Sequence, residues 1–423
     1  MKIRSLLLKT LLAAITKASA ALIAFFMTAT ITRLLGPIQA GLFLLALSIL
    51  SFCSVFFRLG LDNVIIRLIG ANEGEESSIG GLSTGLIWAV SGAVSISFLV
   101  SFFANEIALN VFSKPEFSNV LSLMICALPF MVVFMLLSCG FQAFYRVIAA
   151  VFFQNLGVSG LFLIIFFLSF FYANVNILSA EQVARFYLFS SIVVCFTALF
   201  MWHRQIKGKW GRFKLLDNKL WASSSNLWVA TIMTLSVQWS AILIAGAFVS
   251  SSEIAYLAAA QRTATLISFV LMVVNMVVAP RYALLWKEKN IDEIQKLAKW
   301  STRGMLLLAL PVVIVMLVVP DLIMALFGDE FIVAGELLAI MAIGQFTSVA
   351  TGSVGYLLNM SNHEKDYRRV TMFAGPLTII LSYLFIVQWG VTGAAIATAI
   401  GLSLQNIGAL FMVRKRLGFW PIG

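Results

Sequence analysis

Residues 41–66 read GLFLLALSILSFCSVFFRLGLDNVII, an apolar stretch that contains only two charged residues, Arg58 and Asp62. A helix that crosses a bilayer needs about 20 predominantly apolar residues, so this stretch predicts one membrane span. Two further cations, Lys17 and Arg262, lie inside apolar stretches of the same kind. A charge at the centre of a span costs about 2.5–3.5 kcal/mol on insertion scales and therefore faces protein or water. The pattern indicates a polytopic membrane protein with a cationic interior, which suits an anionic substrate.

The composition of the whole chain agrees with this interpretation. Of the 423 residues, 61% are hydrophobic and 11% are charged, whereas soluble domains carry about 25% charged residues. The net charge of +11 does not indicate nucleic-acid binding, because most basic residues flank apolar stretches, as in membrane topology signals. The four cysteines have no metal-ligand spacing, and the two histidines form no cluster. We therefore expect no metal, no cofactor, no nucleic-acid partner and no catalytic residue.

The apolar stretches predict an all-α fold with twelve membrane spans. They lie near 10–33, 41–66, 80–104, 118–144, 148–172, 182–202, 221–249, 254–279, 303–320, 332–358, 370–389 and 392–412. One side of the membrane receives 23 of the 29 basic residues, and the other receives only Arg33, Lys114 and Arg185. By the positive-inside rule, both termini are cytoplasmic.

The N-terminus also offers a second interpretation. The sequence Ala-Ser-Ala at 18–20 resembles a signal-peptide cleavage site. However, Lys9 and Lys17 interrupt the apolar core that such a signal needs. We expect the first stretch to be retained as a span.

The two halves of the chain show a weak internal repeat. An offset of about 214 residues aligns the two halves, as in transporters built from internal repeats. It pairs Arg67 with Arg281, Ala46 with Ala260, and Glu116-Phe117 with Glu330-Phe331. Because six spans per half is an even number, the halves are expected to be parallel repeats around an axis normal to the membrane. We predict an N-terminal six-helix lobe over 1–203, a basic cytoplasmic linker over 204–220 and a C-terminal six-helix lobe over 221–423.

Arg58 and Lys17 are candidate substrate-binding residues, and each also has a structural interpretation. Asp62 follows Arg58 by four residues, which places both on one helix face, so the pair can be a structural ion pair. Lys17 lies roughly 10 Å inside the first span at 1.5 Å per residue. A lysine at this depth can also extend its ammonium group back to the membrane surface.

Arg262 is the candidate with the fewest alternatives. If its span begins near Glu253, Arg262 lies roughly 13 Å inside, and no acid is found at helical spacing within reach. Its neighbour Gln261 would extend the polar surface for substrate binding. Asp62 and Glu253 are the candidates for an ion pair or for coupling to an ion.

A series of short motifs runs through the whole chain. They are Arg33-Leu-Leu-Gly-Pro37, Gly41-Leu-Phe, Arg58-Leu-Gly-Leu-Asp62, Ala255-Tyr-Leu-Ala-Ala-Ala-Gln-Arg262, Ala279-Pro-Arg281, Phe327-Gly-Asp-Glu-Phe331 and Gly390-Val-Thr-Gly-Ala-Ala-Ile-Ala-Thr398. In this order and spacing they resemble the polysaccharide transporters, which include the O-antigen flippases. These transporters form a family within the multidrug/oligosaccharidyl-lipid/polysaccharide (MOP) superfamily.

The resemblance implies a V-shaped, alternating-access transporter with two six-helix lobes. It implies movement of an undecaprenyl-pyrophosphate-linked oligosaccharide, such as an O-antigen or capsule repeat unit, to the outer leaflet of a bacterial cytoplasmic membrane. The expected partners are this lipid-linked substrate, membrane lipids and other polysaccharide-assembly proteins, with the transporter itself acting as a monomer. Related peptidoglycan-precursor flippases place cations in the first, second and eighth helices, which here contain Lys17, Arg58 and Arg262.

Two other classes of protein are alternatives. A multidrug exporter of the same superfamily would favour buried acids for cationic drugs, and the balance of charge here is cationic. A membrane-embedded glycan polymerase or ligase would need positioned acid and base groups, commonly on a large outer loop. The outer segments of this chain are short, so the flippase interpretation is preferred over an enzyme.

Overall fold

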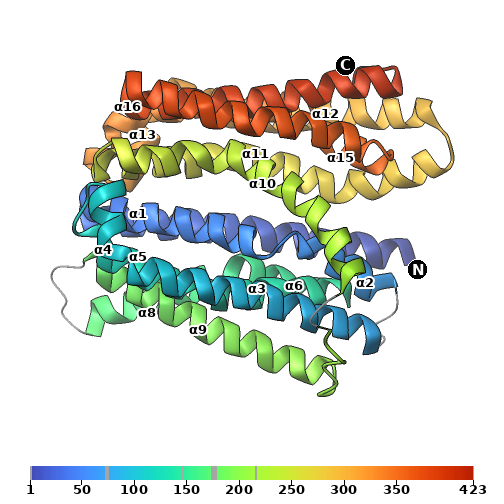
Figure 1. Cartoon of the computed structure of the whole chain (residues 1–423). Coiled ribbons are helices and arrows are strands. Elements are labelled where there is room, and N and C mark those ends of the chain that lie inside the picture. Colours follow the sequence, from blue (N-terminus) through green and yellow to red (C-terminus); the bar gives the residue numbers. More distant parts are fainter. Residues whose placement is uncertain (1, 72–75, 145, 173–178, 215–216, 423) are drawn as a thin grey trace. The chain divides into compact units, whose positions relative to one another are not determined.

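The computed structural model describes residues 2–71, 76–144, 146–172, 179–214 and 217–422. In these ranges the chain is helical and forms no strand. It divides into two compact units, Met1–Ile232 and Met233–Gly423. The boundary between the units falls inside one helix, α10, which spans Asn218–Phe248. Figure 1 shows that each unit, taken by itself, is built mainly of long helices.

The N-terminal unit contains the helices up to the first part of α10. These are α1 (Lys2–Phe57), α2 (Leu61–Ala71), α3 (Glu76–Phe102), α4 (Ala104–Glu106), the π-helical turn η1 (Ile107–Val111), α5 (Phe117–Cys126), α6 (Leu128–Ala143), α7 (Val147–Val151), the π-helical turn η2 (Phe152–Leu156), α8 (Gly157–Tyr172) and α9 (Ala180–Gln205).

The C-terminal unit contains the rest of α10 and the helices that follow it. These are α11 (Ser251–Lys287), α12 (Ile291–Val318), α13 (Pro320–Met324), the 3-10 turns η3 (Ala325–Phe327) and η4 (Asp329–Ala334), α14 (Gly335–Ala350), α15 (Val354–Met360) and α16 (Glu364–Leu417).

Ten helical stretches in the described part of the chain are long and apolar enough to cross a membrane. Two of them, at the ends of the chain, contain a glycine with non-helical backbone angles. Gly36 has φ 70° and ψ 171°, and Pro37 follows it. Gly390 has φ 57° and ψ −134°. A positive φ is readily adopted by glycine, which lacks a Cβ. The glycines divide each of these stretches into two helical arms, and the count of twelve spans stays a prediction.

Helix α16 is an antiparallel hairpin that turns at Gly390. A straight helix of its 54 residues would be roughly 80 Å long, far more than the ~30 Å of a hydrocarbon core. Instead, residues at similar distances on either side of Gly390 meet. The pairs are Thr378 with Gly401, Val370 with Gly408, and Asp366 with Arg416. The two ends of α16 therefore lie at the same end of the unit.

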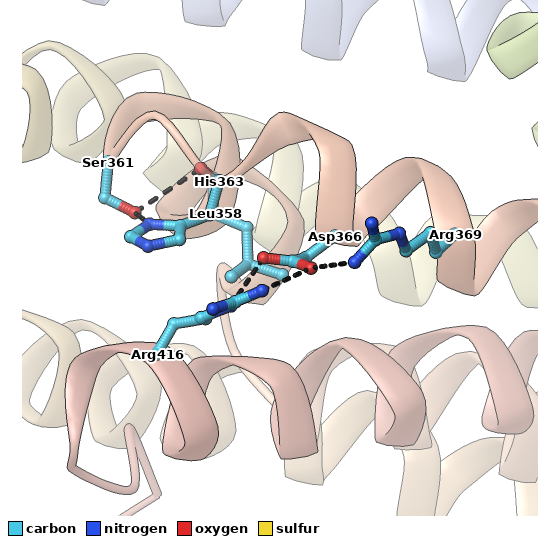
Figure 2. Close-up of polar contacts among 6 residues, drawn as sticks. All are labelled: Leu358, Ser361, His363, Asp366, Arg369 and Arg416. Atoms are coloured by element: carbon cyan, nitrogen blue, oxygen red, sulfur yellow. Dashed lines mark hydrogen bonds and ion pairs between the residues drawn. The ribbon is translucent and has the colours of Figure 1, made fainter.

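A buried carboxylate closes this hairpin (Figure 2). Asp366 is 5% exposed. It accepts hydrogen bonds from Arg416 Nε at 2.7 Å and Arg416 Nη2 at 3.0 Å, and from Arg369 Nη1 at 3.1 Å. The backbone N–H of Asp366 also donates to the carbonyl of His363 at 3.0 Å. Paired, bidentate contacts of this kind are the strong form of an ion pair. Asp366 thus joins the first turn of α16 to its last.

Residues paired by the internal repeat have similar surroundings in the two units. Ala46 and Ala260 are both buried, and so are Phe117 and Phe331. Each of these phenylalanines follows a turn, at which the backbone N–H of Phe117 donates to Lys114 and that of Phe331 to Gly328. Both Arg67 and Arg281 are exposed. The internal repeat stays a prediction.

The segment after α9 packs along the start of α3 within the N-terminal unit. Ser83 Oγ donates to the carbonyl of Trp210 at 2.7 Å, and the N–H of Lys214 donates to Thr84 Oγ1 at 2.9 Å. This segment covers most of the linker expected over 204–220, whose residues 215–216 lie outside the described residues. The first part of α10, up to Ile232, belongs to the same unit.

We expect the Asp366→Asn variant to be less stable than the wild-type protein. The amide keeps the shape of the side chain but removes the charge that holds two guanidinium groups. Hydrogen bonds to charged groups contribute about 1.5–3 kcal/mol, and solvent exposure of both arginines reduces this to about 1 kcal/mol. The apparent unfolding temperature in detergent should fall by about 2–4 °C.

Glu364→Gln is the matched control, because Glu364 is an exposed acid in the same turn of α16. Surface changes of this kind usually alter stability by less than about 0.5 kcal/mol. Equal unfolding temperatures for the two variants would show that the ion pairs of Asp366 do not stabilise the hairpin.

Candidate functional site

The second expected span is interrupted where its charged residues lie. The sequence predicts a continuous helix over 41–66, but α1 ends at Phe57 and α2 begins at Leu61. Between them, Leu59 and Gly60 have φ angles of 55° and 71°. We call residues 58–60 the α1–α2 break. Non-helical backbone at membrane depth is tolerated only where protein or a water-filled cavity surrounds it, so the break corrects the prediction of one regular span.

Arg58 and Asp62 bridge this break. Arg58 Nη1 lies 2.9 Å from Asp62 Oδ1, and Arg58 Nε donates to the carbonyl of Ser54 at 3.2 Å. Asp62 lies in the first turn of α2, where a negative charge is favoured by the helix dipole. The thiol of Cys139, from α6, donates to Asp62 Oδ1 at 3.7 Å. The predicted ion pair is therefore present, and Arg58 remains 14% exposed at its side chain.

Lys17 lies on the first arm of α1 and is half-buried. It belongs to the same unit as Arg58. Its depth in the membrane stays a prediction. Its role in substrate binding stays a prediction.

Arg262 and Gln261 lie on α11 in the C-terminal unit, and both are half-buried. Gln261 Nε2 donates to the carbonyl of Gln238 on α10 at 2.7 Å. Glu253 is part of the cap that begins α11. Its carboxylate accepts from the N–H of Ser250 at 2.9 Å, while Ser250 Oγ accepts from the N–H of Glu253 at 3.3 Å. This capping box fixes the start of the helix and gives Glu253 a structural contact.

A second break, which the sequence analysis missed, lies in the C-terminal unit between α14 and α15. Gly352 has φ 77°, and the N–H of Val354 donates to the carbonyl of Gly352 at 2.9 Å. The Thr302 hydroxyl, on α12, lies so close to Gly352 that a Cβ there would collide with it. In hindsight, the signal is Gly352 among the polar residues Thr351 and Ser353 inside an apolar stretch.

The structure brings together Arg58 with Asp62, and Gln261 with Gln238. Lys17 and Arg58 belong to the N-terminal unit, whereas Arg262 belongs to the C-terminal unit. Within the described residues, no group of three or more His, Cys, Asp or Glu side chains could hold a metal ion.

Comparison with known proteins shows the family to which this chain belongs. Residues 6–286 match the model of the family described as polysaccharide biosynthesis protein, and residues 227–384 match the MatE model. Because the first match covers more than half of the chain, the chain belongs to the polysaccharide biosynthesis protein family. The family resemblance found in the sequence motifs is therefore confirmed.

One curated relative is the "Probable low-salt glycan biosynthesis flippase Agl15" of Haloferax volcanii, which is 27% identical over 171 residues. The matched segment covers 40% of this chain and 36% of that relative. The chain thus matches only about a third of the length of Agl15.

Two solved structures share the fold over nearly the whole chain. A lipid II flippase, MurJ, in an inward closed conformation has a TM-score of 0.75 at 15% identity, and the match covers 96% of this chain and 87% of MurJ. An inward-facing multidrug resistance transporter of the MATE family has a TM-score of 0.76 at 14% identity, with 96% and 98% covered. At these identities the similarity establishes the fold and confirms the all-α membrane architecture.

A double-mutant cycle separates a structural role of Arg58 from a binding role. If the pair with Asp62 is mainly structural, Arg58→Ala and Asp62→Ala should each lower the stability, because each leaves one charge without its partner. The double variant should then recover part of the loss, with a coupling energy of about 1–2 kcal/mol. Thermal unfolding of the four proteins in detergent measures this coupling, and a value near zero would leave Arg58 available for a ligand.

Proposed function

We propose that the protein moves a lipid-linked oligosaccharide from the cytoplasmic to the outer leaflet of the cytoplasmic membrane by alternating access. The observation that carries this proposal is a cation at an interrupted helix, Arg58 in the α1–α2 break, in a chain that belongs to the polysaccharide biosynthesis protein family. The flippase name of Agl15 and the fold shared with MurJ support it. The proposed orientation has both termini in the cytoplasm.

The proposed substrate carries its oligosaccharide on a polyprenyl pyrophosphate, such as undecaprenyl pyrophosphate. A pyrophosphate with about two negative charges cannot enter hydrocarbon without compensation. Guanidinium groups offset this cost through charge-assisted hydrogen bonds. In the proposal, Lys17 and Arg58 act from the N-terminal unit, while Arg262 and Gln261 act from the C-terminal unit. An inside-negative potential also favours outward movement of an anion, by about 2.3 kcal/mol per charge per 100 mV.

The MatE match over residues 227–384 favours a second candidate, the export of cationic drugs. Such export relies on buried acids that attract the drug. Of the two acids singled out from the sequence, Asp62 pairs with Arg58, and Glu253 takes part in the cap of α11. These contacts leave both carboxylates engaged with the protein, and the lipid-linked glycan remains the proposed substrate.

Reconstitution in liposomes tests the proposal directly. Wild-type protein should move a fluorescent undecaprenyl-pyrophosphate oligosaccharide between leaflets, as measured by the fraction that an external quencher or enzyme can reach. Failure to move any lipid-linked oligosaccharide, together with export of cationic dyes, would favour the multidrug exporter.

Arg262→Ala should abolish or strongly reduce this movement without preventing membrane insertion. Loss of a hydrogen bond to a charged group costs about 1.5–3 kcal/mol, so the apparent affinity should fall on the order of ten- to a hundred-fold. Arg281→Ala is the matched control, because Arg281 is an exposed cation on the same helix. Transport at the wild-type level in Arg262→Ala would assign Arg262 a structural role.

A further inference from the structure

The indole of Trp228 completes the hydrogen bonding of the α1–α2 break. The last carbonyls of a helix have no partner within the helix, and Phe56 lies in the last turn of α1. The carbonyl of Phe56 accepts from Trp228 Nε1 at 2.8 Å and from the N–H of Leu59 at 3.2 Å. The rings of Phe56 and Trp228 also meet edge to face, with centroids 5.0 Å apart. The Trp228 side chain of α10 thus donates a hydrogen bond to the last turn of α1 and also packs against it.

A second contact joins the same two segments on the other side of Arg58. A Cβ placed on Gly60 would lie 2.5 Å from the backbone nitrogen of Trp228 and 2.6 Å from the carbonyl oxygen of Ser224. Both atoms belong to the backbone of α10, which cannot move aside as a flexible side chain does. Glycine is therefore needed at position 60 for close approach as well as for its φ of 71°.

These two contacts enclose Arg58. Phe56 and Gly60 precede and follow it by two residues, and both rest on one turn of α10. The guanidinium itself is directed by the carbonyl of Ser54 and by Asp62. Residues 58–60 form a turn, in which the N–H of Leu61 donates to the carbonyl of Arg58 at 2.9 Å. The contacts of Phe56 and Gly60 with α10 hold this turn on both sides of Arg58.

Helix α10 also carries the boundary between the two units. The turn that contacts the break lies before Ile232, and the helix continues into the C-terminal unit as far as Phe248. A change in the direction of α10 would therefore act on the backbone of the break. This arrangement offers a mechanical connection between the conformation of α10 and the direction of Arg58.

We propose that Trp228 is a positioning residue for Arg58, and that its indole N–H and the close contact at Gly60 transmit the conformation of α10 to the Arg58 guanidinium. The inference rests on the proposed function, in which Arg58 contacts the anionic group of the substrate. Trp228 acts through the backbone of the break and does not itself touch the substrate.

Trp228→Phe tests the proposal because it keeps an aromatic ring and removes the N–H donor. In the liposome assay, the concentration of lipid-linked oligosaccharide at half-maximal rate should rise about three- to ten-fold, the range for loss of one hydrogen bond. Trp221→Phe is the matched control on the same helix. The Trp221 ring packs against Trp88 with centroids 6.0 Å apart. This variant removes an indole N–H but keeps the donor to Phe56, so it should behave as the wild type.

A double-mutant cycle with Arg58→Ala distinguishes positioning from general stabilisation. If Trp228 acts through Arg58, Trp228→Phe should have no further effect on the half-maximal concentration once Arg58 is alanine. An equal effect in both backgrounds would overturn the proposal, because it would assign Trp228 to the fold alone.

The reactivity of Cys139 gives a readout that needs no substrate. The residue is 3% exposed and its thiol donates to Asp62 Oδ1, so loosening of the break should expose the thiol. In a protein whose other three cysteines are replaced by alanine, N-ethylmaleimide should modify Cys139 several-fold faster when Trp228→Phe is added, and no faster with Trp221→Phe. Gly60→Ala should have the same effect as Trp228→Phe.

Failure of the two hypotheses gives different results. If wild-type protein moves no lipid-linked oligosaccharide, the proposed function fails, while faster modification of Cys139 in Trp228→Phe would still support the contact between α10 and the break. If the wild type transports and neither Cys139 reactivity nor the half-maximal concentration changes in Trp228→Phe, the positioning role is overturned and the proposed function stands.

Discussion

Backbone hydrogen bonding in a medium without water is the constraint on which this structure depends. Each unsatisfied peptide group in hydrocarbon costs several kcal/mol, so the chain is helical throughout the described apolar regions. The few interruptions are therefore informative. At the α1–α2 break, the indole of Trp228 replaces a helical donor for the carbonyl of Phe56. Between α14 and α15, Val354 donates to Gly352 in place of the helical acceptor. Each interruption occurs where other groups can satisfy the backbone.

The same medium determines how charges are held. Arg58 is balanced by Asp62 across a break, and Asp366 is balanced by two arginines at the ends of a hairpin. In both cases the carboxylate lies near the start of a helix, where the dipole favours it. The two pairs differ in their surroundings. Asp366 joins segments that are 50 residues apart, whereas Asp62 orients a cation only four residues away. The contacts of Asp366 stabilise the hairpin, whereas the contact of Asp62 holds a cation beside the α1–α2 break.

The sequence predicts the helical membrane fold and most span positions, because apolar length and the distribution of basic residues are local and strong signals. It also predicts the Arg58–Asp62 pair, since four-residue spacing places both on one face. It does not predict that the helix breaks between them. Gly60 packs on the backbone of α10, a distant segment of the chain, and this contact leaves no local pattern in the sequence. Glu253 was singled out as a coupling candidate, but the Ser-x-x-Glu cap that engages it begins at Ser250 and is readable from sequence. The role of Trp228 depends on distant packing and leaves no local pattern.

The hairpin of α16 has a consequence for how the protein is made. Synthesis proceeds from the N-terminus, so the arm that contains Asp366 leaves the ribosome about 50 residues before Arg416. In the folded protein the carboxylate has two arginine partners, but during this interval only Arg369, three residues away, has been made. The second arm then returns along the first, with small residues such as Gly401 and Gly408 against Thr378 and Val370. Closure of the ion pair by Arg416 therefore waits until the second arm has been made and has folded back along the first.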